Sequence, residues 1–114
     1  MDVVCILDTS GSMSGQKIRN LQRAMEFVIN TLNEYDRLAV ITFEEEAQII
    51  QGFTRLEASK KAESLARTNN LRAGGGTSIL AGLQAGQRML TSRAHRNPAS
   101  CVFLLTDGQD SSHP

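Results

Sequence analysis

Apolar residues gather in three nearly continuous runs, which cover Val3–Leu7, Leu38–Phe43 and Cys101–Leu105. Runs of this length and density are typical of strands that are covered on both faces of a parallel sheet. A shorter run, Ala47–Gln51, follows the second one after the three glutamates Glu44–Glu46. The short separation predicts a hairpin whose second strand lies at the edge of the sheet.

Between the first two runs, apolar residues recur at helical spacing. They form one stripe that faces a core: Ile18, Leu21, Met25, Val28, Ile29 and Leu32. This pattern predicts a long amphipathic helix.

Two more helices are predicted between the hairpin and the last run. The spacing of Thr54 and Glu57 indicates a capping box at the start of the first of these helices. Its modest apolar face would consist of Ala58, Ala62, Leu65 and Ala66. Ser78 is the expected N-cap of the second helix. The expected inward residues of that helix are Ile79, Leu80, Leu83, Met89 and Leu90.

Buried strands that alternate with helices predict an α/β fold. We expect a Rossmann-like, doubly wound and mostly parallel sheet with an antiparallel edge strand and helices on both faces. The 114 residues, of which 40% are hydrophobic, suffice for one core. A single domain spanning residues 1–114 is therefore expected.

The charge balance limits the kinds of partner that are expected, and the positions of the cysteines indicate their state. Lys plus Arg and Asp plus Glu both number 12, which argues against a nucleic-acid or membrane-surface partner. Cys5 and Cys101 lie inside apolar runs and are expected to be buried free thiols. The chain shows no signal peptide and no apolar run of membrane-spanning length, so a cytoplasmic location is expected.

Short oxygen-bearing side chains follow the predicted strands or a glycine-rich loop. They are Asp8, Ser10, Ser12, Thr77 and Asp107. In a doubly wound sheet, ligands bind beyond the carboxyl ends of the strands, where the winding direction reverses. These five residues would meet there, and their oxygens are the ligands that a small hard cation needs. Each residue alone could merely cap a helix or open a turn.

The same residues carry a resemblance to a known family. The runs D-T-S-G-S at 8–12, G-G-G-T at 74–77 and T-D-G at 106–108 resemble the metal-ion-dependent adhesion site of von Willebrand factor type A domains. The likeness covers the chain in order and includes the intervening segment D-R-L-A-V-I-T-F at 36–43. Among such domains, it is nearer to intracellular ones, including those joined to a RING-type ubiquitin ligase module.

The resemblance implies a Mg²⁺ ion, with Mn²⁺ or Ca²⁺ as alternatives, and a protein-binding rather than an enzymatic role. Ser10 and Ser12 would bind the ion directly, Thr77 directly or through water, and Asp8 and Asp107 largely through water. An Asp or Glu side chain of a partner protein would supply the remaining ligand. Neutral inner ligands would leave the ion electrophilic enough to attract that carboxylate.

Domains of this family usually continue past the third motif with two more strands and their helices. The resemblance therefore implies that the present chain lacks these elements. Residues 101–105 would then form an uncovered apolar edge strand, through which self-association is expected.

Two other functions compete with metal-dependent binding. The run G-S-M-S-G at 11–15 fits the G-x-S-x-G pattern of serine hydrolases, with Ser14 as the nucleophile. That reading needs a histidine at the same edge of the sheet, whereas His95 precedes the last strand and His113 lies in the tail. The second alternative is a metal-free structural scaffold. Nucleotide binding by the glycine run is disfavoured because no phosphate-loop or dinucleotide fingerprint accompanies it.

The run Glu44–Glu46 ends a strand that points toward the predicted metal edge. We expect it either to form an acidic rim that favours partners with basic residues, or simply to protect the hairpin edge from unwanted pairing.

Overall fold

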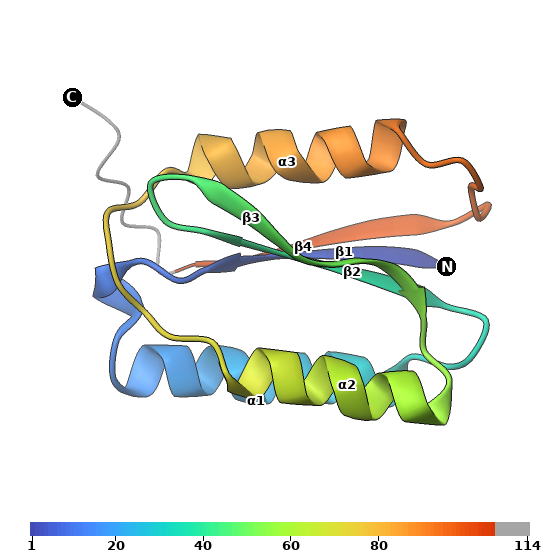
Figure 1. Ribbon diagram of the computed structural model, residues 1–114, viewed down its shortest axis with the longest axis horizontal. Coiled ribbons are helices and arrows are strands. Elements are labelled where there is room, and N and C mark those ends of the chain that lie inside the picture. The colour runs from blue at the N-terminus through green and yellow to red at the C-terminus, as the bar shows by residue number, and fades with distance from the viewer. Residues whose placement is uncertain (107–114) are drawn as a thin grey trace.

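A four-stranded sheet lies between two helical layers in the computed structural model, which describes residues 1–106 (Figure 1). The strands are β1 (Asp2–Asp8), β2 (Arg37–Phe43), β3 (Ala47–Arg55) and β4 (Ser100–Leu105). Their spatial order is β3-β2-β1-β4, with β1 parallel to both β2 and β4 and with β3 antiparallel to β2. The predicted mostly parallel sheet with an antiparallel edge strand is confirmed.

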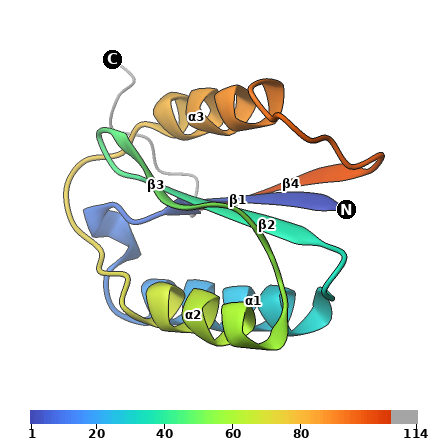
Figure 2. The ribbon, with the colours of Figure 1, turned by 45° about the vertical axis from the view of Figure 1, so that its right-hand side comes forward.

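The helices cover both faces of this sheet. Helices α1 (Gln16–Thr31) and α2 (Ala58–Asn69) pack side by side on one face, and α3 (Ile79–Thr91) lies on the other (Figures 1 and 2). A short 3₁₀ turn, η1 (Gly11–Met13), joins β1 to α1. None of the helices in the described part of the chain combines the length and apolar character needed to cross a bilayer.

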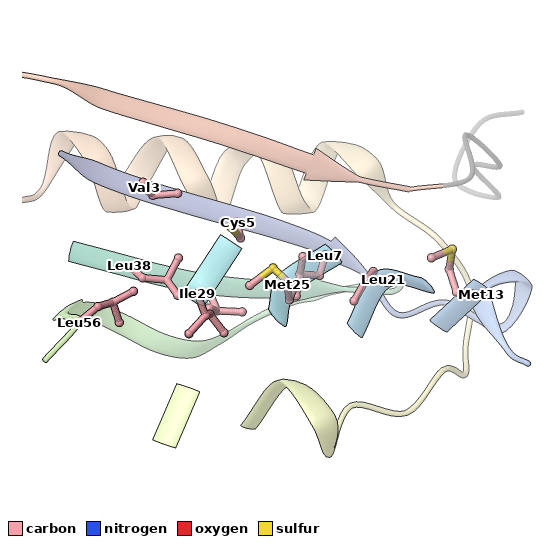
Figure 3. Close-up of a cluster of buried hydrophobic side chains, with 10 residues drawn as sticks. Val3, Cys5, Leu7, Met13, Leu21, Met25, Ile29, Leu38 and Leu56 are labelled. Atoms are coloured by element: carbon pink, nitrogen blue, oxygen red, sulfur yellow. The ribbon is translucent and has the colours of Figure 1, made fainter. Parts of the chain in front are cut away.

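The larger hydrophobic core lies between the sheet and α1, as Figure 3 shows. It contains the residues Val3, Cys5, Leu7, Met13, Leu21, Met25, Ile29, Leu38, Val40 and Leu56. The predicted stripe of α1 is confirmed, because its members are either in this core or packed against it. Burying this stripe holds the start of α1 close to the carboxyl end of β1.

The predicted inward face of α3 is confirmed only in part: Ile79, Met89 and Leu90 pack against the second core, between the sheet and this helix. Leu80 and Leu83 were expected to face the core, but they are 61% and 43% exposed. The helix instead buries Gly82 and Gly86 against the sheet. A Cβ atom at either glycine would lie 2.7 Å from a side-chain carbon of the sheet, which is too close for any larger residue without rearrangement. Glycine sets how closely the helix approaches the sheet.

The predicted start of α2 is wrong, and its predicted apolar face is confirmed only for Leu65, which packs against the larger core. Thr54 lies within β3, so the helix begins only after Glu57 and the expected capping box does not form. The buried residues of α2 are Ser64 and Thr68 rather than its alanines. The Ser64 hydroxyl donates to Gln51 Oε1 at 2.9 Å, and Gln51 Nε2 donates to a β2 carbonyl at 3.1 Å. These hydrogen bonds offset the cost of burying polar groups.

Strand β4 forms one edge of the sheet within the described residues. Its side chains Val102, Phe103 and Leu104 are exposed, so the predicted apolar edge is present, whereas self-association through it stays a prediction. Cys101 is only partly buried, contrary to expectation, because it lies on this edge strand. Cys5 is buried in β1, and burial raises the pKa of its thiol to about 12.

Candidate metal centre

Asp8, the last residue of β1, has a fully buried side chain. Its Oδ1 accepts hydrogen bonds from the Ser10 amide at 2.9 Å and from the Ser10 hydroxyl at 2.6 Å. Its Oδ2 accepts a hydrogen bond from the Thr106 hydroxyl at 2.7 Å. All three donors are neutral, although a buried carboxylate is costly unless its charge is compensated. This carboxylate therefore favours a cation in its vicinity.

Ser10 and Ser12 come together through the 3₁₀ turn that follows β1. The Met13 amide donates to the Ser10 carbonyl at 3.0 Å, and this turn brings the Ser12 and Ser10 Oγ atoms within 3.1 Å of each other. Adjacent oxygen ligands of an octahedral Mg²⁺, each at about 2.1 Å, lie about 3 Å apart. The two hydroxyls therefore have the spacing of neighbouring metal ligands. Ser10 is buried, whereas Ser12 is partly exposed and borders the surface.

The glycine-rich loop between α2 and α3 is hydrogen-bonded to the residues on both sides of Ser10. The Gly74 amide donates to the Thr9 carbonyl at 2.8 Å, and the Gly11 amide donates to the Gly75 carbonyl at 2.9 Å. The same loop carries Thr77, whose side chain is buried. The loop thus brings Thr77 to the edge of the sheet that holds Asp8, Ser10 and Ser12.

Gly75 suits its position mainly through its backbone conformation. Its φ of 85° lies in the left-handed region that favours glycine. A Cβ there would also lie 2.8 Å from Glu44 Oε2. Glu44, at the turn between β2 and β3, therefore borders the glycine loop, as expected for an acidic rim. Whether the run Glu44–Glu46 influences a partner stays a prediction.

Two residues of the third motif, Thr106 and Asp107, also bear on the site. Asp107 lies outside the described residues. Thr106 was part of the motif that carried the family resemblance, but sequence reasoning did not assign it to the site. Its contact with Asp8 depends on β4 lying beside β1, a pairing that no local signal reveals.

Among the described residues, hydroxyl groups rather than a cluster of carboxylates or imidazoles gather at the candidate site. Within residues 1–106, no group of three or more His, Cys, Asp or Glu side chains is placed to hold a metal ion. A metal at Ser10 and Ser12 would therefore depend on hydroxyl ligands. Hydroxyl and carboxylate oxygens suit the hard ions Mg²⁺ and Ca²⁺ better than softer metals.

The geometry does not favour the serine hydrolase. Ser14 is exposed at the end of η1, next to the carboxyl ends of the parallel strands. His95 lies at the opposite end of the sheet, where its carbonyl accepts a hydrogen bond from Arg37, the first residue of β2. His113 lies outside the described residues.

Comparison with known proteins places this architecture in a family. A model of the von Willebrand factor type A domain matches residues 3–109, nearly the whole chain. The chain belongs to this family. The resemblance predicted from the motifs is thus confirmed for the domain type.

Two relatives of this von Willebrand factor type A domain are proteins of different kinds. The chain is 32% identical over 110 residues to the E3 ubiquitin-protein ligase WAV3 of Arabidopsis thaliana, and the match covers 96% of the chain and 15% of the relative. It is 34% identical over 111 residues to calcium-activated chloride channel regulator 1 of Bos taurus, covering 95% of the chain and 12% of the relative. The chain therefore spans less than a fifth of either protein.

Solved structures show the same fold. A von Willebrand factor type A protein from Catenulispora acidiphila superposes with a TM-score of 0.89 at 27% identity, covering 99% of this chain and 28% of that one. The PilB minor pilin from Streptococcus sanguinis superposes with a TM-score of 0.76 at 26% identity, covering 94% of this chain and 30% of the pilin. These similarities confirm the Rossmann-like architecture of the domain.

Proposed function

We propose that this domain is a divalent-metal-dependent protein-interaction module. The observation that carries the proposal is the 3.1 Å contact between the Ser10 and Ser12 hydroxyls beside the fully buried carboxylate of Asp8. Ser10 donates its hydroxyl hydrogen to Asp8 and therefore accepts from Ser12 in their 3.1 Å hydrogen bond, which leaves Ser10 one further lone pair for a metal. Asp8 thereby orients the ligand and supplies compensating negative charge.

In this proposal Ser10 and Ser12 bind Mg²⁺ directly, and Thr77 binds it directly or through water. Asp8 and Asp107 act largely through water. Mn²⁺ or Ca²⁺ would use the same oxygens. Because the direct protein ligands are neutral hydroxyls, the ion keeps most of its positive charge and attracts a carboxylate from outside. An Asp or Glu side chain of a partner protein occupies that position.

The partner is defined here by chemistry and not by the relatives. Their names describe a ubiquitin ligase, a channel regulator and a pilin, which differ in activity, and the chain spans a small part of each. We therefore propose no catalytic activity for this domain. The acidic run Glu44–Glu46 beside the glycine loop would favour partners that carry basic residues next to the metal-binding carboxylate.

A paramagnetic titration tests the metal site directly. Chelator-stripped, ¹⁵N-labelled protein is titrated with Mn²⁺, which broadens the amide signals near a bound ion. We expect selective broadening at Ser10, Ser12 and Thr77. Ser10→Ala should weaken it at least tenfold in Mn²⁺ concentration, and Ser14→Ala, a matched change in the same turn, should not. Broadening spread over all acidic surfaces, or equal in both variants, would contradict the metal site.

Carboxylate capture has a separate readout in the same sample. Water bound to Mn²⁺ relaxes bulk water protons, and acetate that replaces this water lowers the relaxation enhancement. We expect acetate to reduce the enhancement of the Mn²⁺-loaded protein in a saturable way. No saturable effect, with selective broadening intact, would retain the metal and remove the carboxylate from the proposal.

A further inference from the structure

Two arginines face each other at the end of the strands that lies away from the candidate metal centre. Arg37 opens β2 and Arg55 closes β3, and the two are direct partners in the antiparallel register. Directly opposed residues in such a pair project from the same face of the sheet, where like charges destabilise each other. The strand register therefore concentrates positive charge on the α3 face of this edge.

A third arginine adds to this charge. Arg93, which follows α3, donates to Asp2 Oδ2 at 2.6 Å, as does Arg37. The guanidinium carbons of Arg37 and Arg93 lie 5.1 and 5.9 Å from the ring centre of Phe53. Asp2 neutralises one of these two guanidinium charges. Together with Arg55, the three arginines keep a local excess of two positive charges.

Of the two acidic residues nearby, Asp36 is engaged by another group, and Glu34 is exposed. Asp36 forms an ion pair with the N-terminal ammonium at 2.6 Å. Glu34 borders a different cleft, which Lys61 also lines, and contributes only its carbonyl to Arg55 Nε, at 3.3 Å. Asp36 is therefore not available to neutralise Arg55, and Arg37 shares the single negative charge of Asp2 with Arg93.

The positive charge lines a cleft of about 460 Å³. Its walls are formed by Tyr35, Arg37, Arg55, His95 and Asn97. The Arg37 NH2 group donates to the His95 carbonyl at 2.6 Å, so the loop before β4 is tied to this wall. The cleft thus combines Arg37, which Asp2 holds in place, with the exposed Arg55 and with polar groups of Tyr35 and His95.

We propose that this cleft binds a phosphate group, either as free phosphate or as a phosphomonoester. Guanidinium groups match phosphate oxygens in geometry and charge. A bound phosphate would balance Arg55 and the positive charge that Arg37 and Arg93 hold in excess of Asp2, and it would relieve the repulsion between Arg37 and Arg55. Arg55 closes onto the ligand, and Arg37, held by Asp2, stays in place. The site is independent of the candidate metal centre, at the other end of the strands.

The test uses metal-free, ¹⁵N-labelled protein titrated with inorganic phosphate at constant ionic strength set with chloride. We expect saturable shifts of the amide signals of Tyr35, Arg55 and His95. Arg55→Gln should weaken the fitted affinity at least fivefold. Arg23→Gln, an exposed arginine on α1, is the matched control and should change it less than twofold. Because both variants change exposed side chains, dispersed spectra will verify that each is folded.

A second titration with O-phosphoserine identifies the source of the phosphate group. Tighter binding than inorganic phosphate supports a phosphomonoester, and equal or weaker binding supports free phosphate. Absence of saturable shifts at this edge would overturn the proposal. An equal loss of affinity in Arg55→Gln and Arg23→Gln would also overturn it, since it would reflect only the general charge of the protein. Neither result depends on metal binding by Ser10 and Ser12.

Discussion

The two ends of β1 each carry a fully buried aspartate. Charged donors surround the first aspartate, and neutral donors surround the second. Asp2, at the start of the strand, accepts hydrogen bonds from Arg37 at 2.6 and 2.8 Å and from Arg93 at 2.6 Å. Burial alone would raise the pKa of the Asp2 carboxyl, but these hydrogen bonds outweigh burial and hold its pKa well below the usual range. Its negative charge is compensated by the protein itself.

Asp8, at the other end, accepts hydrogen bonds from the Ser10 amide, the Ser10 hydroxyl and the Thr106 hydroxyl. These donors orient the carboxylate but carry no positive charge. Asp2 therefore secures the fold, because its charge is already balanced by two arginines. Asp8 is suited to a cation from outside, because its charge is not balanced by its hydrogen-bond donors.

The largest expected effect is the loss of unfolding free energy when Asp2 is replaced. Asp2→Asn keeps the shape of the side chain but leaves Arg37 and Arg93, whose side chains are 17% and 10% exposed, without their carboxylate. Breaking a buried ion pair in this way costs about 3–5 kcal/mol of the free energy of unfolding. Urea denaturation of metal-free protein measures the loss.

Two control substitutions show whether the loss is specific to Asp2. Glu63→Gln breaks the exposed pair of Lys60 and Glu63 and should cost at most about 1 kcal/mol. Asp8→Asn in metal-free protein should cost clearly less than Asp2→Asn, since it removes a buried charge that its donors do not balance. Equal losses for Asp2→Asn and Asp8→Asn would erase the proposed difference between the two ends of the strand.

The next largest expected effect is that of metal, which should narrow the difference in stability loss between Asp2→Asn and Asp8→Asn. A ligand that binds only the folded state, present at a hundred times its dissociation constant, stabilises that state by about 2.7 kcal/mol. We expect Mg²⁺ near this excess to raise the unfolding free energy of wild-type protein by that amount and to leave Asp8→Asn nearly unchanged. Glu63→Gln should respond as the wild type does. The same gain in Asp8→Asn would show that the ion binds elsewhere.

The layers of the fold could be predicted because they follow from local patterns. The apolar runs gave the strands, and the alternation of strands and helices gave the sheet and its two covered faces. The stripe of α1 was visible for the same reason. The face of α3 was predicted only in part, since Ile79, Met89 and Leu90 do pack against the core. Gly82 and Gly86 were missed because they have no side chain, and a search for apolar side chains does not find them.

The candidate site could be predicted in part. Asp8, Ser10 and Ser12 form one short motif, and the structure brings their oxygens together. Thr106 was not assigned to the site, because its contact with Asp8 arises only when β4 pairs with β1. The arginines around Asp2 were missed as well. Arg37 and Arg93 are 56 positions apart along the chain and meet only in the folded structure.

The smallest expected effect concerns acid. Because the pKa of Asp2 is lower in the folded than in the unfolded protein, its ion pairs contribute full stability above the unfolded pKa of about 4 and lose it as the pH falls toward the folded pKa. The difference in unfolding free energy between wild type and Asp2→Asn should therefore be constant from pH 7 to pH 5. It should shrink by about 1 kcal/mol at pH 3.

Paired urea titrations at pH 7, 5, 4 and 3 measure this difference, and all carboxyls other than Asp2 are common to both proteins. Glu63→Gln provides the matched comparison, since its exposed ion pair should give a much smaller change over the same range. A difference between wild type and Asp2→Asn that stays constant down to pH 3 would mean that the arginines do not hold the carboxyl ionised more strongly than water does. The contrast between the two ends of β1 would then rest on metal binding at Asp8 alone.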